Sequence, residues 1–392
     1  SVGSSGLRRD VFLLSLAAFT SSASLRAPDP LLRLIAEDYD VTTGDAAGAV
    51  TAFALAYGLL QIICGPLGDR YGRYRTIAAA AFVSALGSLA CAAAPDLRSL
   101  VAARFVAGAT IGAFIPLSLA WIGDTFPYAQ RQPVLARFLI GQMVGIGFGA
   151  AAAGWLAERY GWRAIFVLLA AVLLAIATML AFEARRQLPP AARASIAQSF
   201  ARMPALLLDR SVRGLLAIGF CEGLLIFGAL AFVALYFQRR FGVGPGTAGS
   251  LVAVYAVGGL AYATVAPRAL RRLGEIGLAT LGGGALALGY AVLATSPWLA
   301  PAAVGLGAIG GGFYMFHTTL QARLTQVAPA ARGSTVALFA TFLFMGQASG
   351  VWLASNLADA IGIAPVFGTS AVGLAALALV FRRRLLSSPR AP

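Results

Sequence analysis

The sequence predicts an all-α membrane protein with 12 transmembrane helices arranged as two bundles of six. The chain is 59% hydrophobic and only 11% charged, with a mean hydropathy of +0.81. A soluble domain of this length needs far more polar surface. Apolar stretches of about 18 residues or more recur along the whole chain, and each is long enough to cross a bilayer as a helix. One stretch, 183–212, is too polar to span and separates two sets of six crossings.

Each predicted helix is an apolar run bounded by residues that favour turns. Prolines such as Pro95, Pro245 and Pro297 stand in or beside the connections, where a missing amide is tolerated. The predicted helices cover about 11–35, 46–67, 76–94, 99–123, 133–156, 162–182, 213–237, 247–267, 275–295, 299–322, 333–357 and 363–381. The predicted domains are an N-terminal six-helix bundle (1–182), a cytoplasmic central loop (183–212) and a C-terminal six-helix bundle (213–392).

The distribution of positive charge predicts the orientation. All 30 basic residues are arginine, and the net charge is +15. With the N-terminus placed inside, 22 arginines fall on the cytoplasmic side and 6 on the outer side. The positive-inside rule then places both termini and the central loop in the cytoplasm. The arginines are spread over many short loops rather than one face, which argues against nucleic-acid binding.

The two halves of the sequence resemble each other. The segment 141–145 of helix 5 (GQMVG) matches 346–350 of helix 11 (GQASG), and 161–166 before helix 6 matches 362–367 before helix 12. A third match joins 66–72 after helix 2 with 267–274 after helix 8. The shared order of these matches indicates an internal duplication, which is the architecture of transporters whose halves rock against each other.

The connection between helices 2 and 3 carries the most informative sequence of the chain. It is Gly65-Pro66-Leu67-Gly68-Asp69-Arg70-Tyr71-Gly72-Arg73-Tyr74-Arg75, with acidic and basic residues at the water end of an apolar helix. It resembles the loop 2–3 motif of the major facilitator superfamily, except that the second basic residue is displaced to Arg75. The resemblance covers essentially the whole chain and implies the fold of that superfamily. It also implies that Gly65, Asp69, Arg70, Gly72, Arg73 and Arg75 form a cytoplasmic latch, which we expect to stabilise the outward-facing state against the end of helix 11.

Two further segments resemble motifs of proton-coupled members of the superfamily. In helix 4, Arg104 is followed by Gly108 and Gly112 at four-residue intervals. In helix 5, a glycine-rich segment at 145–154 resembles the antiporter motif, although the proline that normally follows the second-half glycine is missing. The pattern is closest to prokaryotic drug or sugar efflux proton antiporters, and this resemblance implies a protein of the bacterial inner membrane.

Five ionisable residues lie inside predicted spans, on helices 1, 4, 7 and 10, which line the central cavity in the family fold: Arg26, Asp29, Arg104, Glu222 and His317. A charge at the bilayer centre costs roughly 2.5–3.5 kcal/mol on insertion scales, so each needs a reason. Arg26 and Asp29 are three residues apart and are expected to share one helix face, although Pro28 and Pro30 should kink the helix. Asp29 and Arg104 are placed to pair. The alternative is a purely structural network that holds helices 1 and 4 together.

Glu222 and His317 are the ionisable residues of the C-terminal half. Glu222 lies near the midplane of helix 7, and no basic residue is within one helical turn. We predict Asp29 and Glu222 as the proton-coupling residues, with Arg26, Arg104 and His317 binding substrate or assisting the coupling. The alternatives are purely structural roles. Glu222 would be protonated and donate to a backbone carbonyl, and His317 would be an interior residue whose hydrogen bonds are satisfied by its neighbours. A single histidine cannot build a metal site. The spacing of the three cysteines indicates neither a metal site nor a disulfide framework.

Aromatic and amide residues in the spans are candidates to shape a cavity, although packing alone also accounts for each aromatic. The candidates are Tyr57, Gln61, Gln142, Tyr255, Tyr262, Tyr314, Gln347 and Asn356. Of these, Tyr57, Gln61, Gln142, Tyr314 and Gln347 are the predicted substrate-binding or coupling residues.

The sequence therefore predicts a secondary transporter that exports a drug-like or sugar-like small molecule against protons by alternating access. It contains no nucleotide-binding motif of the Walker type, so we expect no cofactor beyond the proton gradient. The expected partners are a small-molecule substrate, protons and the lipid bilayer, with a monomeric chain. The alternatives are proton-coupled uptake of a small organic anion and a receptor or sensor that does not transport. An enzyme is not expected, because no nucleophile or metal cluster converges.

Overall fold

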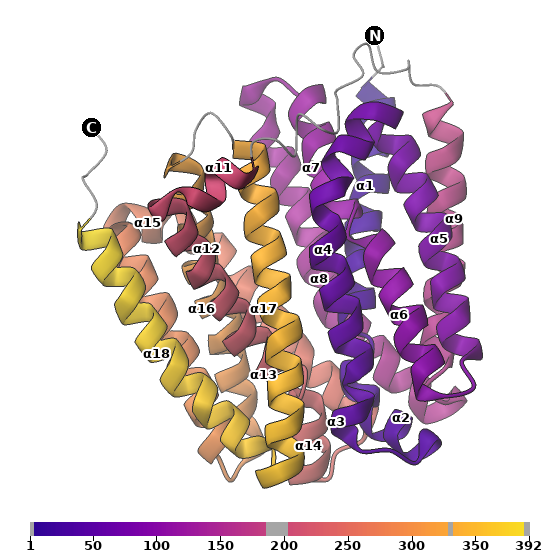
Figure 1. Cartoon of the computed structure of the whole chain (residues 1–392), viewed down its shortest axis with the longest axis vertical. Coiled ribbons are helices and arrows are strands. Elements are labelled where there is room, and N and C mark those ends of the chain that lie inside the picture. Colours follow the sequence, from indigo (N-terminus) through magenta and orange to yellow (C-terminus); the bar gives the residue numbers. More distant parts are fainter. Residues whose placement is uncertain (1–3, 186–202, 328–331, 388–392) are drawn as a thin grey trace.

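Every regular element of the described residues is helical, as the sequence predicts. The computed structural model describes residues 4–185, 203–327 and 332–387. Most of the predicted central loop, 186–202, lies outside them, so the division of the chain at 183–212 stays a prediction. Two groups of helices lie side by side, one from the first half of the sequence and one from the second (Figure 1). We call the face where α1 starts and α18 ends the terminal face, and the opposite face the distal face.

The N-terminal half contains six crossings, three of them interrupted. Its elements are α1 (Ser4–Arg26), η1 (Asp29–Leu31), α2 (Leu32–Tyr39), α3 (Thr43–Ala46), α4 (Gly48–Tyr71), α5 (Arg73–Ala93), α6 (Leu97–Ile111), α7 (Phe114–Thr125), α8 (Tyr128–Tyr160) and α9 (Ala164–Ala184). Helix 1 consists of α1, η1 and α2, helix 2 of α3 and α4, and helix 4 of α6 and α7. Helices 3, 5 and 6 are α5, α8 and α9.

The C-terminal half contains the remaining crossings. Its elements are α11 (Met203–Leu208), α12 (Arg210–Glu222), the π-helical η2 (Gly223–Phe227), α13 (Gly228–Leu230), α14 (Val233–Phe241), α15 (Pro245–Thr295), α16 (Leu299–Val327), α17 (Arg332–Ile361) and α18 (Ile363–Ser387). Helix 7 is α12 to α14, and helices 10, 11 and 12 are α16, α17 and α18.

The long element α15 accounts for two of the 12 predicted crossings. Eleven helical stretches of the described residues are long and apolar enough to span a membrane, and one of them is the 51-residue α15. At about 1.5 Å per residue it would be roughly 77 Å long if straight, more than twice the roughly 30 Å of a bilayer core. Its backbone breaks at Gly274, with φ 64° and ψ −179°. Helices 8 and 9 are therefore the two arms of α15.

Glycine turns repeat at equivalent positions of the two halves. Gly72 (φ 89°) ends helix 2 and Gly274 (φ 64°) ends helix 8. Gly161 (φ 81°) precedes helix 6 and Gly362 (φ 95°) precedes helix 12. Side chains other than glycine rarely tolerate these backbone angles. These pairs are among those that match in the sequence, so the same turns recur in both halves.

Close helix packing repeats as well. Helix 5 lies against helix 1 so closely that a Cβ at Gly145 would overlap the carbonyl oxygen of Phe19. Helix 11 approaches helix 7 in the same way, since a Cβ at Gly346 would overlap the carbonyl oxygen of Phe220. Small residues permit this backbone approach in membranes, where dispersion rather than the hydrophobic effect holds helices together. The matching helix 5 and helix 11 segments of the sequence are therefore packing surfaces.

Burial is highest for helices 1 and 7. The apolar windows of helices 1 and 7 are each 72% buried, against 44% for helices 3 and 6 and 39% for helix 12. Buried charges lie on central helices 1, 4 and 7. The peripheral helices instead expose large apolar side chains, as expected of surfaces that face lipid: Val83, Leu86, Leu89, Val167, Leu168, Leu174, Val372, Leu379 and Val380.

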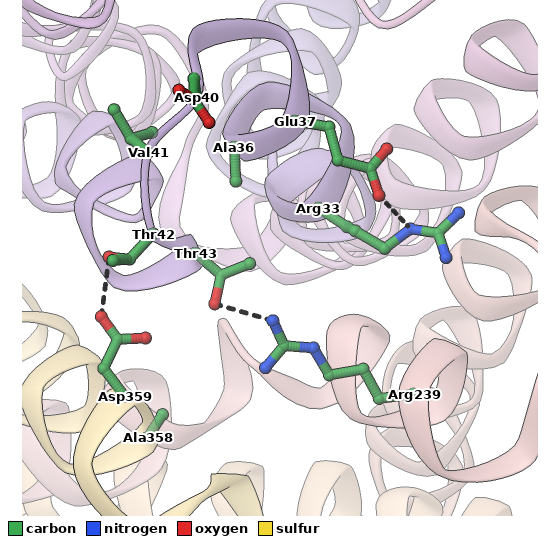
Figure 2. A pocket seen from close by; sticks show the side chains of 10 residues that line it. All are labelled: Arg33, Ala36, Glu37, Asp40, Val41, Thr42, Thr43, Arg239, Ala358 and Asp359. Carbon is green, nitrogen blue, oxygen red and sulfur yellow. Dashed lines mark hydrogen bonds and ion pairs between the residues drawn. The ribbon is translucent and has the colours of Figure 1, made fainter.

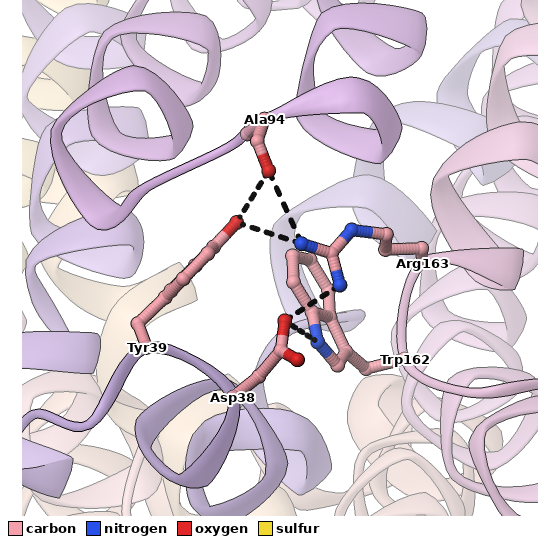
Figure 3. A network of polar contacts seen from close by, with 5 residues as sticks. All are labelled: Asp38, Tyr39, Ala94, Trp162 and Arg163. Atoms are coloured by element: carbon pink, nitrogen blue, oxygen red, sulfur yellow. Dashed lines mark hydrogen bonds and ion pairs between the residues drawn. The ribbon is translucent and has the colours of Figure 1, made fainter.

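A polar network ties the distal ends of the N-terminal helices together (Figure 3). Arg163 Nη1 pairs with Asp38 Oδ2 at 2.6 Å, and Trp162 Nε1 donates to the same oxygen at 3.2 Å. Arg163 Nη2 and the Tyr39 hydroxyl both donate to the carbonyl oxygen of Ala94, at 3.1 and 2.8 Å. The network joins the end of helix 1, the end of helix 3 and the start of helix 6. It holds the distal ends of these three helices together.

Candidate substrate and coupling site

The first charged pair sits at a break in helix 1. Pro28 and Pro30 lack the amide protons that would continue the helix, so α1 ends at Arg26 and Asp29 begins a short 3₁₀ turn. Arg26 Nη1 donates to Asp29 Oδ2 at 3.3 Å, and their side chains are 1% and 0% exposed. The two side chains meet, as their three-residue spacing predicts, although α1 ends between them. The kink is confirmed.

Arg104 of α6 supports this break rather than pairing with Asp29. Because Pro28 has no amide proton, the carbonyl oxygen of Ser24 loses its helical partner four residues on. Arg104 Nη1 donates to that oxygen at 3.1 Å, and Arg104 Nε donates to the carbonyl oxygen of Ala49 at 3.4 Å. No ion pair joins Arg104 to Asp29 in the described part of the chain, although the two charges interact at longer range. Instead of the predicted pairing with Asp29, Arg104 hydrogen bonds to backbone carbonyl oxygens of helices 1 and 2.

Glu222 of helix 7 meets His317 of helix 10. The distance from His317 Nδ1 to Glu222 Oε2 is 3.1 Å, with Glu222 fully buried and His317 16% exposed. The imidazole stacks on Phe313 at 4.7 Å between ring centroids. The π-helical turn η2 begins directly after Glu222, and such turns are frequent at functional sites. The partner of Glu222 is a histidine, not the backbone carbonyl considered from the sequence, and the contact spans two helices.

Arg26 reaches from the first charged pair into the C-terminal half. Its guanidinium lies over the ring of Phe227 on helix 7, 4.9 Å from the centroid. It also interacts electrostatically with the hydroxyls of Tyr255, Tyr290 and Tyr314 on helices 8, 9 and 10. Phe227 and Tyr290 were not predicted, because an aromatic in an apolar span carries no distinguishing signal. A basic residue of the N-terminal half thus reaches the aromatic interior of the C-terminal half.

Several buried polar atoms of this region have no hydrogen-bond partner among the described residues. They are Arg26 Nε, Asp29 Oδ1, Arg104 Nη2, Glu222 Oε1, Tyr255 Oη and Gln347 Nε2. Leaving such a group unpaired costs about 1–3 kcal/mol, and more for a charged group, so it needs a functional or solvent explanation. Unpaired hydrogen-bond donors and acceptors, some on cationic and some on anionic side chains, therefore lie in the interior of both halves. A polar substrate or a proton needs such groups in order to bind.

The remaining predicted cavity residues lie apart from the charged pairs. The ring of Tyr57 packs on Phe344 of helix 11 at 4.2 Å, and its hydroxyl is 3.4 Å from Ser21 Oγ. Gln61 is buried and Gln142 is half-buried, and neither has a contact with the four ionisable residues of the two pairs. Tyr57 is thus placed at the contact between the halves, beside the hydrogen bond from Thr341 to the Gly58 carbonyl oxygen. The role of Tyr57, Gln61 and Gln142 in substrate binding stays a prediction.

The predicted latch residues pair within the N-terminal half. Arg73 Nη1 lies 2.5 Å from Asp124 Oδ2 of α7, and Arg73 Nη2 lies 3.5 Å from Asp69 Oδ1. Arg70 and Arg75 are exposed. Gly72 makes the turn, while Gly65 has open space around its Cα. The sequence missed Asp124. A contact with the end of helix 11 stays a prediction, since the side chains of residues 332 and 333 are not described.

The two halves meet through polar contacts at the distal face (Figure 2). Arg239 Nη2 donates to Thr43 Oγ1 at 3.1 Å, and Thr42 Oγ1 donates to Asp359 Oδ2 at 2.8 Å. Both contacts border an open pocket of about 580 Å³ between the halves. Its lining is Arg33, Ala36, Glu37, Asp40, Val41, Thr42, Thr43, Arg239, Ala358 and Asp359.

Helices 5 and 8 add two further contacts at this face. The Gly246 amide at the start of α15 donates to Glu158 Oε1 at 2.8 Å, and Trp155 Nε1 donates to Ser250 Oγ at 2.9 Å. A carboxylate at a helix N-terminus is favoured by the exposed amides and the helix dipole. One half therefore caps a helix of the other, and the distal ends of the two halves are held together.

Comparison with known proteins agrees with this architecture. A family model described as Major Facilitator Superfamily matches residues 14–344. The chain belongs to the Major Facilitator Superfamily. It is a multi-pass membrane transporter of small molecules and not an enzyme. As a superfamily member it shares its fold with the xylose transporter XylE from E. coli, in a partially occluded inward open conformation, at a TM-score of 0.75 and 15% identity over 99% of this chain and 100% of that one.

Sequence relatives within the superfamily include a multidrug export protein and a transporter of an aromatic acid. The MFS-type transporter YdgK of Bacillus subtilis (strain 168) is 30% identical over 60% of this chain and 59% of its own length. The multidrug export protein EmrB of Haemophilus influenzae is 28% identical over 39% of this chain and 30% of its own. The 4-hydroxybenzoate transporter PcaK of Pseudomonas aeruginosa is 26% identical over 47% and 40%.

Proposed function

We propose that this protein is a proton-coupled exporter of a drug-like or sugar-like small molecule that works by alternating access. The observation that carries the proposal is the pair of fully buried carboxylates, Asp29 and Glu222, one on each half and each in contact with a basic side chain. Buried ionisable groups inside a membrane protein mark proton relays and substrate pathways. The likeness to an exporter such as EmrB supports the direction.

Protonation changes the contacts of each carboxylate in this scheme. A proton on Asp29 removes the charge that holds Arg26, whose guanidinium already lies against Phe227 of the other half. A proton on Glu222 removes the negative charge facing His317. In export by exchange, proton and substrate compete for the same carboxylates. A donor group of the substrate binds the unpartnered oxygens Asp29 Oδ1 and Glu222 Oε1 while the carboxylates are charged, and protonation displaces it, which couples the two fluxes.

The proposed location is the inner membrane of a bacterium, with a monomeric chain and both termini in the cytoplasm, as the arginine distribution supports. In that orientation the distal face is the outer face. The polar contacts at the distal face then keep the outer side closed in this conformation. Opening toward the outside requires those contacts to break, while the latch residues around Arg73 come into contact with the end of helix 11.

A second candidate is proton-coupled uptake of a small organic anion. Arg26 and Arg104 are both buried and each has an unpartnered nitrogen, which favours an anionic ligand. The likeness to the 4-hydroxybenzoate transporter PcaK supports this alternative.

The two candidates differ in the direction of proton movement. We would reconstitute the protein in liposomes with a pH-sensitive dye inside and add drug-like cations, sugars or small organic anions outside, without an imposed gradient. Exchange of substrate for protons makes the lumen more alkaline as substrate enters, whereas symport makes it more acidic. Transport of a substrate without any proton movement in either direction would contradict both candidates.

A further inference from the structure

Gln238 of helix 7 makes a buried contact with the Asp29 turn of helix 1. Its Nε2 donates to the carbonyl oxygen of Pro30 at 2.8 Å, across 208 positions of sequence and between the two halves. Gln238 is 5% exposed, and its Oε1 has no hydrogen-bond partner among the described residues. Pro30 directly follows Asp29 in the 3₁₀ turn η1. The contact therefore ends on the peptide next to the proposed proton site.

Both helices that form this contact are interrupted before they reach it. Helix 1 breaks between Arg26 and Asp29, and helix 7 breaks at Ala231 and Phe232, between α13 and α14. Gln238 stands on α14, beyond the break in helix 7. Short non-helical segments of this kind are where a helix pivots during domain motion. The distal third of each helix can thus move relative to the rest, with Gln238 joining the two moving pieces.

The Gln238 contact differs from its neighbours at the distal face in burial. The bonds from Arg239 to Thr43 and from Thr42 to Asp359 lie at least partly in solvent, where water replaces them when they break. Removing the Gln238 donor instead leaves the Pro30 carbonyl buried and unpaired as long as the face is closed, whereas opening the face hydrates that carbonyl. The loss therefore costs the closed state more, because a buried group without its partner bears its full desolvation penalty. Closure of the distal face therefore depends more on Gln238 than on the exposed contacts.

We infer that Gln238 is a positioning residue that links closure of the distal face to the charge state of Asp29. Two guanidinium groups face Asp29, since Arg26 pairs with it and Arg104 interacts at longer range. When Asp29 loses its charge, Arg26 is released and the η1 turn relaxes. The Pro30 carbonyl then leaves Gln238, and the distal face opens. The inference rests on the proposed role of Asp29 as a proton carrier.

The test measures opening of the distal face without transport. Spin labels at Arg98→Cys and Trp298→Cys report the distance between the halves by pulsed electron resonance in a background without native cysteines. Both residues are exposed and lie at the distal ends of opposite halves, Arg98 in the first turn of α6 and Trp298 in the loop between α15 and α16. Gln238→Met keeps the length and volume of the side chain and removes the donor. We expect it to raise the ratio of open to closed distances about tenfold, the order expected for one buried hydrogen bond. Arg239→Gln, the matched control, should raise it less than threefold.

A double-mutant cycle then tests the link to Asp29. Asp29→Asn should open the distal face in the native background and add little in the Gln238→Met background, because both changes act through one contact. Additive effects, an unchanged distance in Gln238→Met, or an equal effect of Arg239→Gln would each overturn the inference. Thermal unfolding of each labelled variant confirms that it is folded. If instead Asp29→Asn keeps proton-coupled flux while the distances behave as expected, the proposed proton role fails and the gate contact stands.

Discussion

Replacement of Glu222 by glutamine separates proton coupling from stability. Glutamine keeps the volume of the side chain and a group that can hydrogen bond to His317, 3.1 Å away, but it cannot take up and release a proton. A hydrogen bond to a charged group contributes about 1.5–3 kcal/mol and a neutral one about 0.5–1.5 kcal/mol, so the change should cost about 1 kcal/mol. For a chain of this size that corresponds to a melting shift of at most about 2–4 °C.

Transport should change far more than stability. In proteoliposomes with an imposed pH gradient, Glu222→Gln should lose substrate accumulation, while exchange of labelled for unlabelled substrate without a gradient persists. The matched control is Glu275→Gln, since Glu275 is a partly exposed carboxyl of the same half that lies 3.9 Å from Arg323. It should accumulate substrate normally. Normal accumulation by Glu222→Gln, or loss of exchange together with accumulation in a folded protein, would refute the assignment of Glu222 as a proton carrier.

Three further predictions concern the other contacts. Asp29→Asn leaves the Arg26 charge buried without its partner, so it should destabilise the protein by about 3–5 kcal/mol in thermal unfolding, and Arg26→Met in the same chain should recover part of that loss. Gly145→Ala should cost about 1–3 kcal/mol, because its Cβ meets the backbone of helix 1, whereas Gly123→Ala, which has open space, should cost nothing measurable. Arg73→Gln removes two ion pairs at the terminal face and should slow turnover while changing stability by less than about 1 kcal/mol; an unchanged turnover rate would reject the latch.

The class of protein and the placement of its crossings follow from local properties of the sequence. Hydropathy over about 18 residues identifies a membrane helix whatever its neighbours are, because the bilayer is the same solvent everywhere. The sequence did not predict that helices 8 and 9 are joined by a single non-helical residue, Gly274, with helix on both sides of it. Pro28 and Pro30 predict a break in helix 1 without tertiary information, since a missing amide is a property of the residue itself.

The partners of the charged residues depend on how the helices are rotated and packed, and the sequence misassigned one of them and missed another. Arg104 bonds a carbonyl 80 residues away that the Pro28 break leaves free, rather than pairing with Asp29. Arg73 bonds Asp124 of helix 4, which no local pattern indicated.

The sequence by itself determined that this is a membrane transporter with a few ionisable residues on helices 1, 4, 7 and 10, because the cost of placing a charge in lipid is set by the span that carries it. Only the tertiary structure decided that Glu222 meets His317 and that Gln238 meets Pro30, contacts separated by 95 and 208 positions. Such contacts depend on which faces of two distant helices approach each other. That choice is made by close packing of small residues along several helices at once, so no single stretch of sequence contains it.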